Sequence, residues 1–592
     1  MEKDQITGIL LILAIFAVYF IFLAPEPEQI QSPDKPRVTQ ETVRKSALPA
    51  NALVDTTVTL GQDYVLENAD LKLTINSRGG QLKSALLKNY KTYYQKPLYI
   101  FSDVADAPAV QFALDGKAAV SVAGIQFAAS GVSAGKQLSL TGRAKSGEQV
   151  MLNYRLADKG FLVDVTAMAK AASGATADSV VVNFSQRLRQ YEKDFEQSRI
   201  TSTINYLNTE EEFDNLSETE SAPQGTAPVG KFYWVSHKQK FFNAGLIQKD
   251  GKWSSLRTSS HIDAADSTQL KTLTTHAAIA KADMKSGVAD FSMYFGPNKY
   301  NILQTVGHDY ERNVHLGWPI LRWVNKYLVL NVFNFLERYI SNYGIIIFLL
   351  VLAIRILLLP LGYKSYISMA KMRVLKPEID EIKSRLGDDS VAIQQEQMKL
   401  YQQVGVSPLQ GCIPLLLQMP ILLAMFNFFP NSIELRQESL WWSEDLSTYD
   451  SVFDLPFKIP GYGDHVSLFT ILMTLSTLAI TYFNSQGSAL TGQMATLQYI
   501  MPLVFTFVLN SLPAGLNYYY LVSNLVSLGQ QFAIKSTVDD TKIRAKLETN
   551  KEKNAVKPPS KFAERLQTML KASEEARKQQ QQTQSTRRSP KK

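Results

Sequence analysis

The sequence predicts an α-helical polytopic membrane protein with six transmembrane helices and a large all-β sandwich domain outside the cytoplasm. Long apolar runs lie at the N-terminus and in the last 250 or so residues, and a polar stretch of roughly 300 residues separates them. Basic charge gathers in the tail, where residues 535–592 hold 16 Lys/Arg against 7 Asp/Glu, compared with a net charge of +8 for the whole chain.

The first apolar run covers residues 6–24. A helix of this length spans about 28 Å, close to the hydrocarbon thickness of a bilayer. A cleaved signal peptide is the alternative, but the run ends in Phe22-Leu23-Ala24-Pro25, a poor cleavage context. We therefore predict an uncleaved signal anchor at 1–24. Residues 25–52 are rich in Pro, Gln and Ser and predict a flexible linker.

Residues 53–310 predict the β-sandwich domain. Leu71, Leu73 and Ile75 alternate with polar residues, and further short segments rich in β-branched and aromatic residues follow. Five of the six histidines lie in or just after this region, but none forms a metal-ligand pair at helical spacing, and no carboxylate pair forms a recognisable motif. We expect no catalytic residue, metal or cofactor here. The single cysteine, Cys412, excludes an intramolecular disulfide.

Residues 311–342 mix aromatic and charged side chains, which suits a helix lying in the membrane interface. The alternative is an amphipathic helix packed on the β domain. The membrane core then covers residues 343–534. Its apolar runs are 343–361, 412–429, 466–483 and 499–534. The last is too long for one crossing, and Pro513-Ala514-Gly515 interrupts it, so we divide it near Leu512.

The distribution of positive charge predicts the topology. Residues 362–411 carry seven Lys/Arg, whereas residues 430–465 carry two. Since cytoplasmic loops are enriched in Lys and Arg, the first loop faces the cytoplasm and the second faces outward. Six spans then leave both termini in the cytoplasm.

Two apolar spans carry polar stripes at helical spacing. One contains Thr470, Thr474, Thr477, Thr481 and Asn484, and the other contains Asn517, Tyr520, Asn524, Ser527 and Gln531. Steps of three and four residues place each set on one side of its helix. The stripes either join helices by hydrogen bonds or face a hydrated groove, and spacing alone does not separate the two.

Arg355 interrupts an otherwise apolar span. A central arginine costs about 2.5–3.5 kcal/mol on insertion scales. It either snorkels to the cytoplasmic headgroups or faces a cavity as a functional charge. The apolar residues that follow it favour the cavity.

Residues 363–407 predict a cytoplasmic helical hairpin. An apolar stripe begins at Met369 and Met372, and the first helix ends at Leu386-Gly387-Asp388-Asp389. The face that carries the methionines is either ordinary packing or an adaptable contact surface. The basic tail, 535–592, is expected to be disordered and to attract phosphates of anionic lipid or ribosomal RNA.

Four segments resemble motifs of the YidC membrane-protein insertases, in matching order and spacing. They are Ser368-Met369-Ala370-Lys371-Met372-Arg373, Leu386-Gly387-Asp388-Asp389, Gly411-Cys412-Ile413-Pro414-Leu415-Leu416-Leu417-Gln418-Met419-Pro420 and Tyr519-Tyr520-Leu521-Val522-Ser523-Asn524-Leu525. The anchor, large domain and later spans resemble the Gram-negative form. The resemblance implies a periplasmic β-supersandwich similar to sugar-mutarotase domains.

It also implies an insertase and chaperone for nascent membrane proteins, which acts alone or with the Sec translocon. Its groove would open to cytoplasm and lipid, and an arginine at Arg355 would attract acidic client segments. The expected groove residues are Arg355, Gln418, Met425, Thr474, Thr477, Thr481, Asn484, Asn510, Asn517, Tyr520, Asn524 and Ser527. A small-solute transporter or channel is the alternative function, and an anchored carbohydrate-acting enzyme is a third.

Overall fold

The computed structural model describes residues 61–114, 120–133, 135–145, 147–263, 265–266, 268–387, 390–406, 413–485 and 493–554. The predicted anchor and linker, the pair Asp388 and Asp389, and residues 555–592 lie outside this range.

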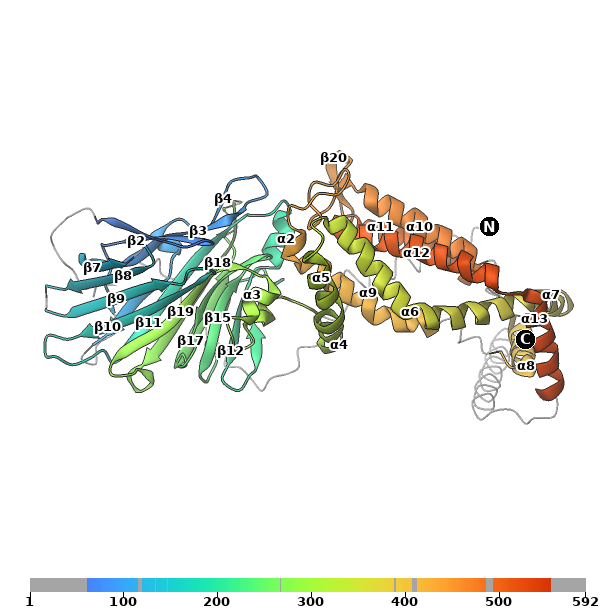
Figure 1. Ribbon diagram of the computed structural model, residues 1–592, viewed down its shortest axis with the longest axis horizontal. Coiled ribbons are helices and arrows are strands. Elements are labelled where there is room, and N and C mark those ends of the chain that lie inside the picture. Colours follow the sequence, from blue (N-terminus) through green and yellow to red (C-terminus); the bar gives the residue numbers. More distant parts are fainter. Residues whose placement is uncertain are drawn as a thin grey trace, which may run out of the picture. The chain divides into compact units, whose positions relative to one another are not determined.

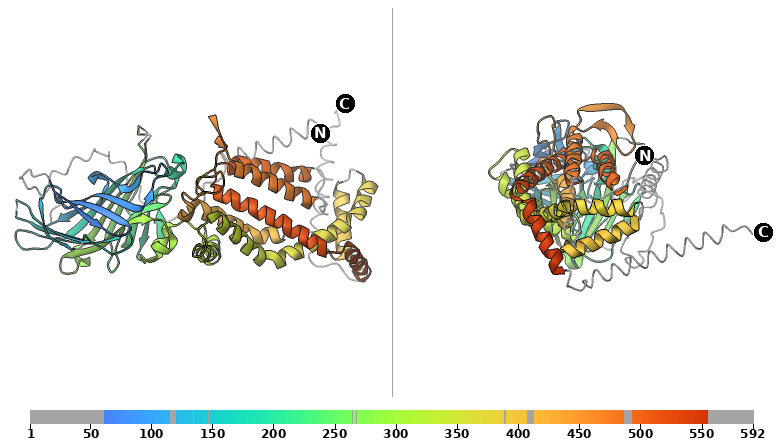
Figure 2. Two further views of the ribbon diagram at one scale, coloured as in Figure 1. Left: turned by 45° about the horizontal axis from the view of Figure 1, so that its top comes forward. Right: turned by 90° about the vertical axis from the view of Figure 1, so that its right-hand side faces the viewer.

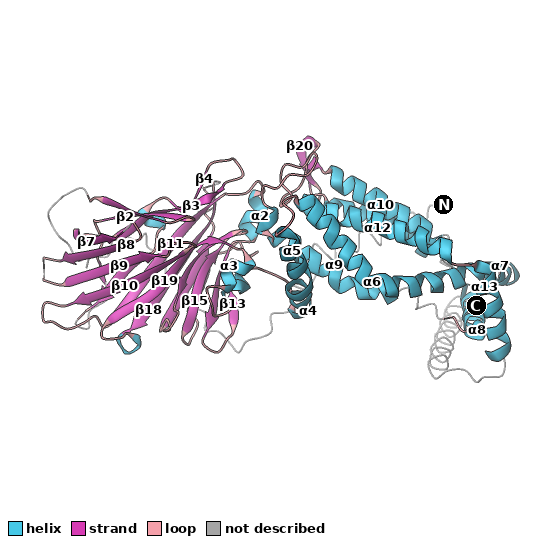
Figure 3. Ribbon diagram, viewed as in Figure 1, coloured by secondary structure: helices cyan, strands magenta, loops and turns pink. Residues whose placement is uncertain are grey.

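Three antiparallel sheets build the β domain (Figures 1 and 3). The four-stranded sheet has the order β1 (Asp63–Glu67), β2 (Leu71–Asn76), β3 (Gln81–Lys91) and β4 (Pro97–Phe101). The six-stranded sheet has the order β14 (Gln224–Thr226), β17 (Ser255–His261), β18 (Gln269–Ala280), β11 (Ser179–Arg189), β5 (Ala109–Ala113) and β6 (Val120–Ser121). The nine-stranded sheet has the order β13 (Phe213–Asn215), β12 (Thr203–Asn208), β15 (Phe232–Lys238), β16 (Phe242–Ile247), β19 (Val288–Pro297), β10 (Leu162–Lys170), β9 (Gln149–Leu156), β8 (Gln137–Arg143) and β7 (Phe127–Ser133).

Alternating side chains build one core between these sheets. On β2, Leu71, Leu73 and Ile75 are fully buried, whereas the polar residues between them are half-buried. All three sheets contribute to the same buried cluster, for example through Leu73, Val165 and Phe184. Because side chains along a strand point to opposite faces in turn, the period of two in the sequence becomes a buried face and an outer face. The predicted all-β sandwich is confirmed.

A buried ion pair joins the β domain to the loop that follows helix α9 (Ile413–Asn431). The Nε of Arg436 donates to both carboxylate oxygens of Glu192 at 2.9 Å, and Nη2 donates to the carbonyl of Lys91 at 2.5 Å. Both charged side chains are less than one-tenth exposed. Burial raises the pKa of Glu192, and Arg436 opposes this rise. Ile433 of the same loop belongs to the β-domain core.

The rest of the described chain is mainly helical (Figures 1 and 2). Its other principal elements are α4 (Pro319–Val324), a π-helical turn (Asn325–Val329), α5 (Leu330–Glu337), α6 (Tyr343–Val374), α7 (Lys376–Leu386), α8 (Ser390–Val404), the hairpin strands β20 (Phe453–Ile459) and β21 (Gly463–Val466), α10 (Leu468–Ser485), α11 (Gln493–Leu509), α12 (Ala514–Thr537) and α13 (Asp540–Asn554). The division of the last apolar run is confirmed, because Pro513 caps the start of α12.

By length and apolar composition, two helices within the described ranges could cross a membrane, α6 and α10. The apolar part of α11, Thr496–Leu509, is shorter. The predicted interfacial segment is helical, and it exposes Trp318, Trp323, Tyr327, Phe335 and Tyr339. In Figure 1, α4 and α5 run across the direction of the long helices.

The first helix of the predicted cytoplasmic hairpin does not begin at residue 363. Helix α6 does not stop near Leu361 but continues through Pro360 to Val374, so Met369 and Met372 belong to α6. A proline inside a helix removes one backbone hydrogen bond and favours a kink, and α6 changes direction along its length in Figure 1. The helix packs on both α12 and α13. The hairpin helices themselves are α7 and α8. Gly387 ends α7 with a φ of 59°.

The prediction of a wholly disordered tail is also wrong. α12 extends to Thr537, and α13 follows at once. Ile543 and Leu547, four residues apart, are buried in a cluster with Ile379 and Tyr401 of the hairpin. Residues at this spacing share one helix face. The ion pairs Arg373–Asp540 and Arg544–Glu378 also join α13 to α6 and α7.

Candidate functional site

Arg355 lies at the contact of three helices. Its Nη1 donates to Oε1 of Gln418 on α9 at 3.4 Å, and its Nη2 donates to Oγ of Ser523 on α12 at 2.6 Å. Gln530 of α12 donates to the backbone carbonyl of Arg355 at 3.3 Å. The side chain is half-buried. It therefore points toward α9 and α12.

No carboxylate within the described part of the chain lies in ion-pair distance of Arg355. Its two named partners, an amide and a hydroxyl, are neutral. A cation in a low-dielectric environment is costly unless it is paired or hydrated. The arrangement therefore leaves a positive charge able to attract a carboxylate.

A second polar cluster joins α10 to α12. Nδ2 of Asn524 donates to Oγ of Ser476 and to Oγ1 of Thr477, each at 2.9 Å. Thr477 donates to the carbonyl of Met473 at 2.8 Å, and Thr481 donates to that of Thr477 at 2.9 Å. A hydroxyl that donates to a carbonyl of the preceding helical turn can still accept a hydrogen bond from another group.

A third cluster lies where α10 and α12 begin, which we call the β-domain end of these helices. Asn517 donates to Oγ1 of Thr470 at 2.8 Å and to the carbonyl of Leu509 at 3.2 Å. The hydroxyls of Thr474 and Thr506 lie 2.8 Å apart. These groups bond helix to helix, as the interhelical alternative predicts for the polar stripes.

Burial decreases along both stripes from the β-domain end to the other end, which we call the hairpin end. On α10, Thr470 and Thr474 are buried, whereas Thr477, Thr481 and Asn484 are half-buried. On α12, Asn517 is fully buried, whereas Tyr520, Asn524, Ser527 and Gln531 are half-buried. The polar faces are therefore closed at one end and accessible at the other. We call the accessible part the recess.

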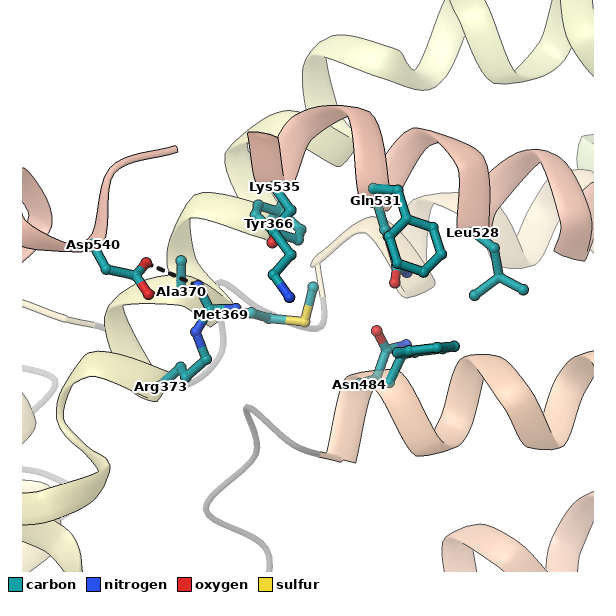
Figure 4. A pocket seen from close by; sticks show the side chains of 11 residues that line it. Tyr366, Met369, Ala370, Arg373, Asn484, Leu528, Gln531, Lys535 and Asp540 are labelled. Carbon is teal, nitrogen blue, oxygen red and sulfur yellow. Dashed lines mark hydrogen bonds and ion pairs between the residues drawn. The ribbon is translucent and has the colours of Figure 1, made fainter. Parts of the chain in front are cut away.

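The recess continues into a cavity of about 250 Å³ at the hairpin end (Figure 4). Helices α6, α10 and α12 and the start of α13 supply its walls. Polar and apolar side chains both line it, and the labelled ones are Tyr366, Met369, Ala370, Arg373, Asn484, Leu528, Gln531, Lys535 and Asp540. Arg373 and Asp540 form an ion pair of 2.8 Å at its edge.

Four expected groove residues lie outside the recess, because Thr474 and Asn517 are buried at the β-domain end and two more are buried elsewhere. Met425 is fully buried in the helical core beside Ala424 and Phe428. Asn510 is also buried, and its side chain bonds the carbonyls of Tyr462 and His465. Of the expected hairpin residues that the structure describes, Leu386 and Gly387 end α7, and only Met369 lines the cavity.

Three polar residues at these contacts were missed by the sequence reasoning, namely Ser476, Ser523 and Gln530. Ser523, Ser527 and Gln530 are separated by four and three residues, so they form a second stripe beside the first. The polar residues of this second stripe were the pattern in the sequence that could have identified Ser523 and Gln530.

His237 shows how the β domain satisfies a buried titratable group. Its Nε2 lies 2.9 Å from Oγ1 of Thr275, its Nδ1 lies 3.3 Å from Oε1 of Gln186, and its ring stacks on Phe184. Burial lowers the pKa of His237 to about 3. A group of three or more His, Cys, Asp or Glu suited to a metal is absent among the described residues.

Comparison with known proteins covers both halves of the chain. Residues 63–330 match the family model described as the YidC periplasmic domain, and residues 335–542 match the model described as 60Kd inner membrane protein. The membrane protein insertase YidC of Cytophaga hutchinsonii is 40% identical over 100% of both chains.

Two solved structures give weaker matches. An active YidC insertase with its first transmembrane domain resolved is 19% identical, covering 81% of this chain and 95% of its own, with a TM-score of 0.33. A galactose mutarotase-like protein from Lactobacillus casei is 11% identical and covers 40% of this chain and 100% of its own, with a TM-score of 0.27. The expected likeness of the β domain to sugar-mutarotase domains stays a prediction.

Proposed function

The chain belongs to the YidC family of membrane protein insertases, and from this premise we propose that its recess receives the polar segments of nascent membrane proteins. Members of the family act on nascent membrane proteins in the bacterial inner membrane, and this chain carries a periplasmic β-sandwich domain and a helical C-terminal part. The proposal concerns the route that a client takes through that helical part.

The observation that carries the proposal is the one-sided burial of the polar stripes. Half-buried groups at the hairpin end offer hydrogen-bond partners to a client backbone, whereas Thr470, Thr474 and Asn517 close the β-domain end. A polar segment that enters such a recess keeps its hydrogen bonds satisfied within the bilayer. It then has less apolar thickness left to cross.

Two buried polar atoms near the recess have no hydrogen-bond partner among the described residues, the hydroxyl of Tyr520 and Oδ1 of Asn517. An unsatisfied buried polar group costs about 1–3 kcal/mol. We propose that Tyr520, which lies at the boundary between buried and half-buried residues, donates to a client backbone carbonyl. Its ring packs against Phe426 of α9 and is therefore held in place.

Arg355 would supply the electrostatic part of the process. An acidic segment of a client would replace part of the neutral contacts to Gln418 and Ser523 with an ion pair. Charge-assisted hydrogen bonds of this kind are roughly twice as strong as neutral ones. The exchange would draw the segment into the recess. The binding would be reversible, because the guanidinium can form its hydrogen bonds to Gln418 and Ser523 again.

We further propose the topology and partners. Six spans with both termini in the cytoplasm would place the hairpin end, α7, α8 and α13 on the cytoplasmic side. The positive charge of residues 362–411 and of the tail supports this orientation. Cooperation with the Sec translocon on larger clients, and contact of the tail with ribosomes or anionic lipid, are part of the same proposal.

Photocrosslinking to a stalled client tests the route. A photoreactive amino acid at Gln418 or Tyr520 should crosslink to a ribosome-bound client whose first span has just emerged. Leu525 is the matched control, since it lies on α12 beside Asn524 but is 54% exposed. Crosslinks from Leu525 alone would reject the recess as the route. Depletion of the protein that leaves small two-span clients inserted normally would contradict the insertase role itself.

A further inference from the structure

An amphipathic β-hairpin lies close to the start of α10. Strands β20 and β21 pair antiparallel through Phe453 and Val466 and through Asp454 and His465, with an irregular ladder toward Ile459. Only Ser467 separates β21 from α10. The hairpin is therefore tied to the level at which α10 begins.

The apolar residues of β20 are Phe453, Leu455, Phe457 and Ile459, whereas Asp454, Pro456 and Lys458 lie between them. The register of the ladder shifts between Asp454 and Ile459, so the exposed fraction of each side chain, and not strict alternation, identifies the residues that face outward. Phe453 and Phe457 are each 61% exposed. Two large aromatic rings thus face away from the protein.

The turn of the hairpin and strand β21 are bonded to the end of α11. Nδ2 of Asn510 donates to the carbonyls of Tyr462 and His465 at 3.0 and 2.8 Å, and the hydroxyl of Ser511 donates to that of Tyr462 at 3.2 Å. Nε2 of His465 lies 2.9 Å from the carbonyl of Asn510. Asn510, which does not reach the recess, has its role here.

The exposed face of the hairpin is continuous with an exposed apolar surface of α11. The ring of Tyr462 packs edge-on against Phe507, with centroids 5.4 Å apart. Phe507 and Val508 are 52% and 62% exposed, and Leu503 and Phe505 are also about half exposed. In a membrane protein such a helix surface faces lipid. The hairpin therefore extends a lipid-facing surface beyond the end of its helix.

The direction of the hairpin fits the membrane surface. In Figure 1, β20 projects across the direction of α10 and α12, and the right-hand view of Figure 2 shows the hairpin standing out from the helices. The helices of a bundle run across the bilayer, so an element perpendicular to them at their ends lies along its surface. Aromatic residues and lysine are the side chains enriched at this level.

We propose that this hairpin is an interfacial anchor that inserts Phe453 and Phe457 into the headgroup and acyl boundary of the leaflet facing the β domain. Lys458 would lie at headgroup level, where its amine can reach lipid phosphates. The anchor would hold the loop between α9 and α10, and with it the Arg436–Glu192 contact, at a fixed height on the membrane. Lipid would therefore cover the apolar face of the hairpin.

An environment-sensitive probe tests the proposal on the full chain in liposomes of phosphatidylethanolamine and phosphatidylglycerol. Cys412→Ser removes the single native thiol, and Phe457→Cys or Lys458→Cys then carries the fluorophore NBD. The label at 457 should emit at shorter wavelength, be quenched by lipids with a nitroxide near the headgroup and be protected from iodide. The neighbouring label at 458 is the matched control and should remain open to iodide.

Two outcomes would overturn the proposal. Equal iodide quenching at both positions would mean that the hairpin lies in water. A label at 457 that is shielded from both iodide and nitroxide lipid would mean that protein, such as a second copy of the chain, covers the face. Neither outcome depends on client insertion, so the recess would be unaffected.

Discussion

Nη2 of Arg355 and Oγ of Ser523 lie 2.6 Å apart and join α6 to α12. A serine hydroxyl satisfies a guanidinium donor but leaves its charge in place. The contact therefore positions a cation without neutralising it, and this combination is what an acidic client segment would need.

Reversal of this charge should impair insertion selectively. Arg355→Glu is expected to reduce insertion most for clients with acidic outer segments, since it repels the groups that the arginine attracts, whereas Arg355→Lys should keep most activity. Protease protection of such clients in depleted cells measures this. Lys364→Glu is the control, because Lys364 is an exposed cation on the same helix. Equal insertion by Arg355→Glu and wild type would reduce Arg355 to a snorkelling anchor.

The two ends of the α12 stripe should separate stability from function. Asn517→Leu removes a buried bond to Thr470 and should lower stability by about 1 kcal/mol, read as a lower Tm in detergent. Asn524→Leu removes a half-buried polar group from the recess, so it should slow client insertion with a smaller change in Tm. A variant pair with the reverse pattern would contradict the assignment of the recess to the hairpin end.

The buried pair Glu192–Arg436 should behave as one unit. Arg436→Met leaves a buried carboxylate without its partner, which typically costs about 3–5 kcal/mol. Adding Glu192→Leu should restore most of the loss. The melting temperature of each single variant and of the double variant measures the coupling, and simple additivity would refute it.

Acid should partly rescue the Arg436→Met variant. Burial raises the pKa of Glu192 and Arg436 opposes this rise, so removal of Arg436 should leave a folded state that favours the protonated acid. The loss of stability caused by the unpaired carboxylate is therefore absent below the ordinary pKa of a glutamate, and it grows as pH rises through the raised pKa. We expect the Tm difference from wild type to shrink between pH 8 and pH 5. A difference that does not change with pH would argue against a buried ionised carboxylate.

His237 should make the β domain sensitive to acid. The pKa of about 3 in the folded state lies below the ordinary value of 6.5. The contribution of neutral His237 to the free energy of unfolding is therefore complete above pH 6.5 and is lost as pH falls toward 3. The slope is about 1.4 kcal/mol per pH unit in that range. Thermal unfolding at pH 7 and pH 5 measures it, with His237→Gln as the control that should lose the extra slope. Identical slopes would show that His237 becomes protonated without unfolding.

Local patterns in the sequence predicted those parts of the structure that depend on neighbouring residues. The alternation of Leu71, Leu73 and Ile75 gives a strand with one buried face, and Pro513 divides the last apolar run because it starts a helix well but cannot continue one. The spacing of Thr470, Thr477 and Asn524 predicted helix faces that do carry interhelical hydrogen bonds.

Other features depend on contacts between distant residues. Periodicity fixes the face on which Thr470 and Thr481 lie but not their depth, so the decrease in burial along the stripe could not be read from spacing. Met425, which the resemblance implied for the groove, is buried in the helical core by contacts between helices. The pair of Glu192 and Arg436 is separated by 244 residues. The docking of α13 was not predicted because its charged sequence shows only two buried apolar residues, Ile543 and Leu547, and its ion pairs join residues far apart in the chain.

Cysteine accessibility tests the one-sided recess most directly. In a Cys412→Ser background, Thr477→Cys and Ser527→Cys should react with a membrane-impermeant maleimide that is added to the cytoplasmic side of inverted vesicles. The same two cysteines should not react when the maleimide is added to the periplasmic side of spheroplasts. Thr470→Cys should react from neither side. Unreactive cysteines at positions 477 and 527 would contradict the recess, and a reactive cysteine at position 470 on both sides would instead indicate a pathway through the membrane.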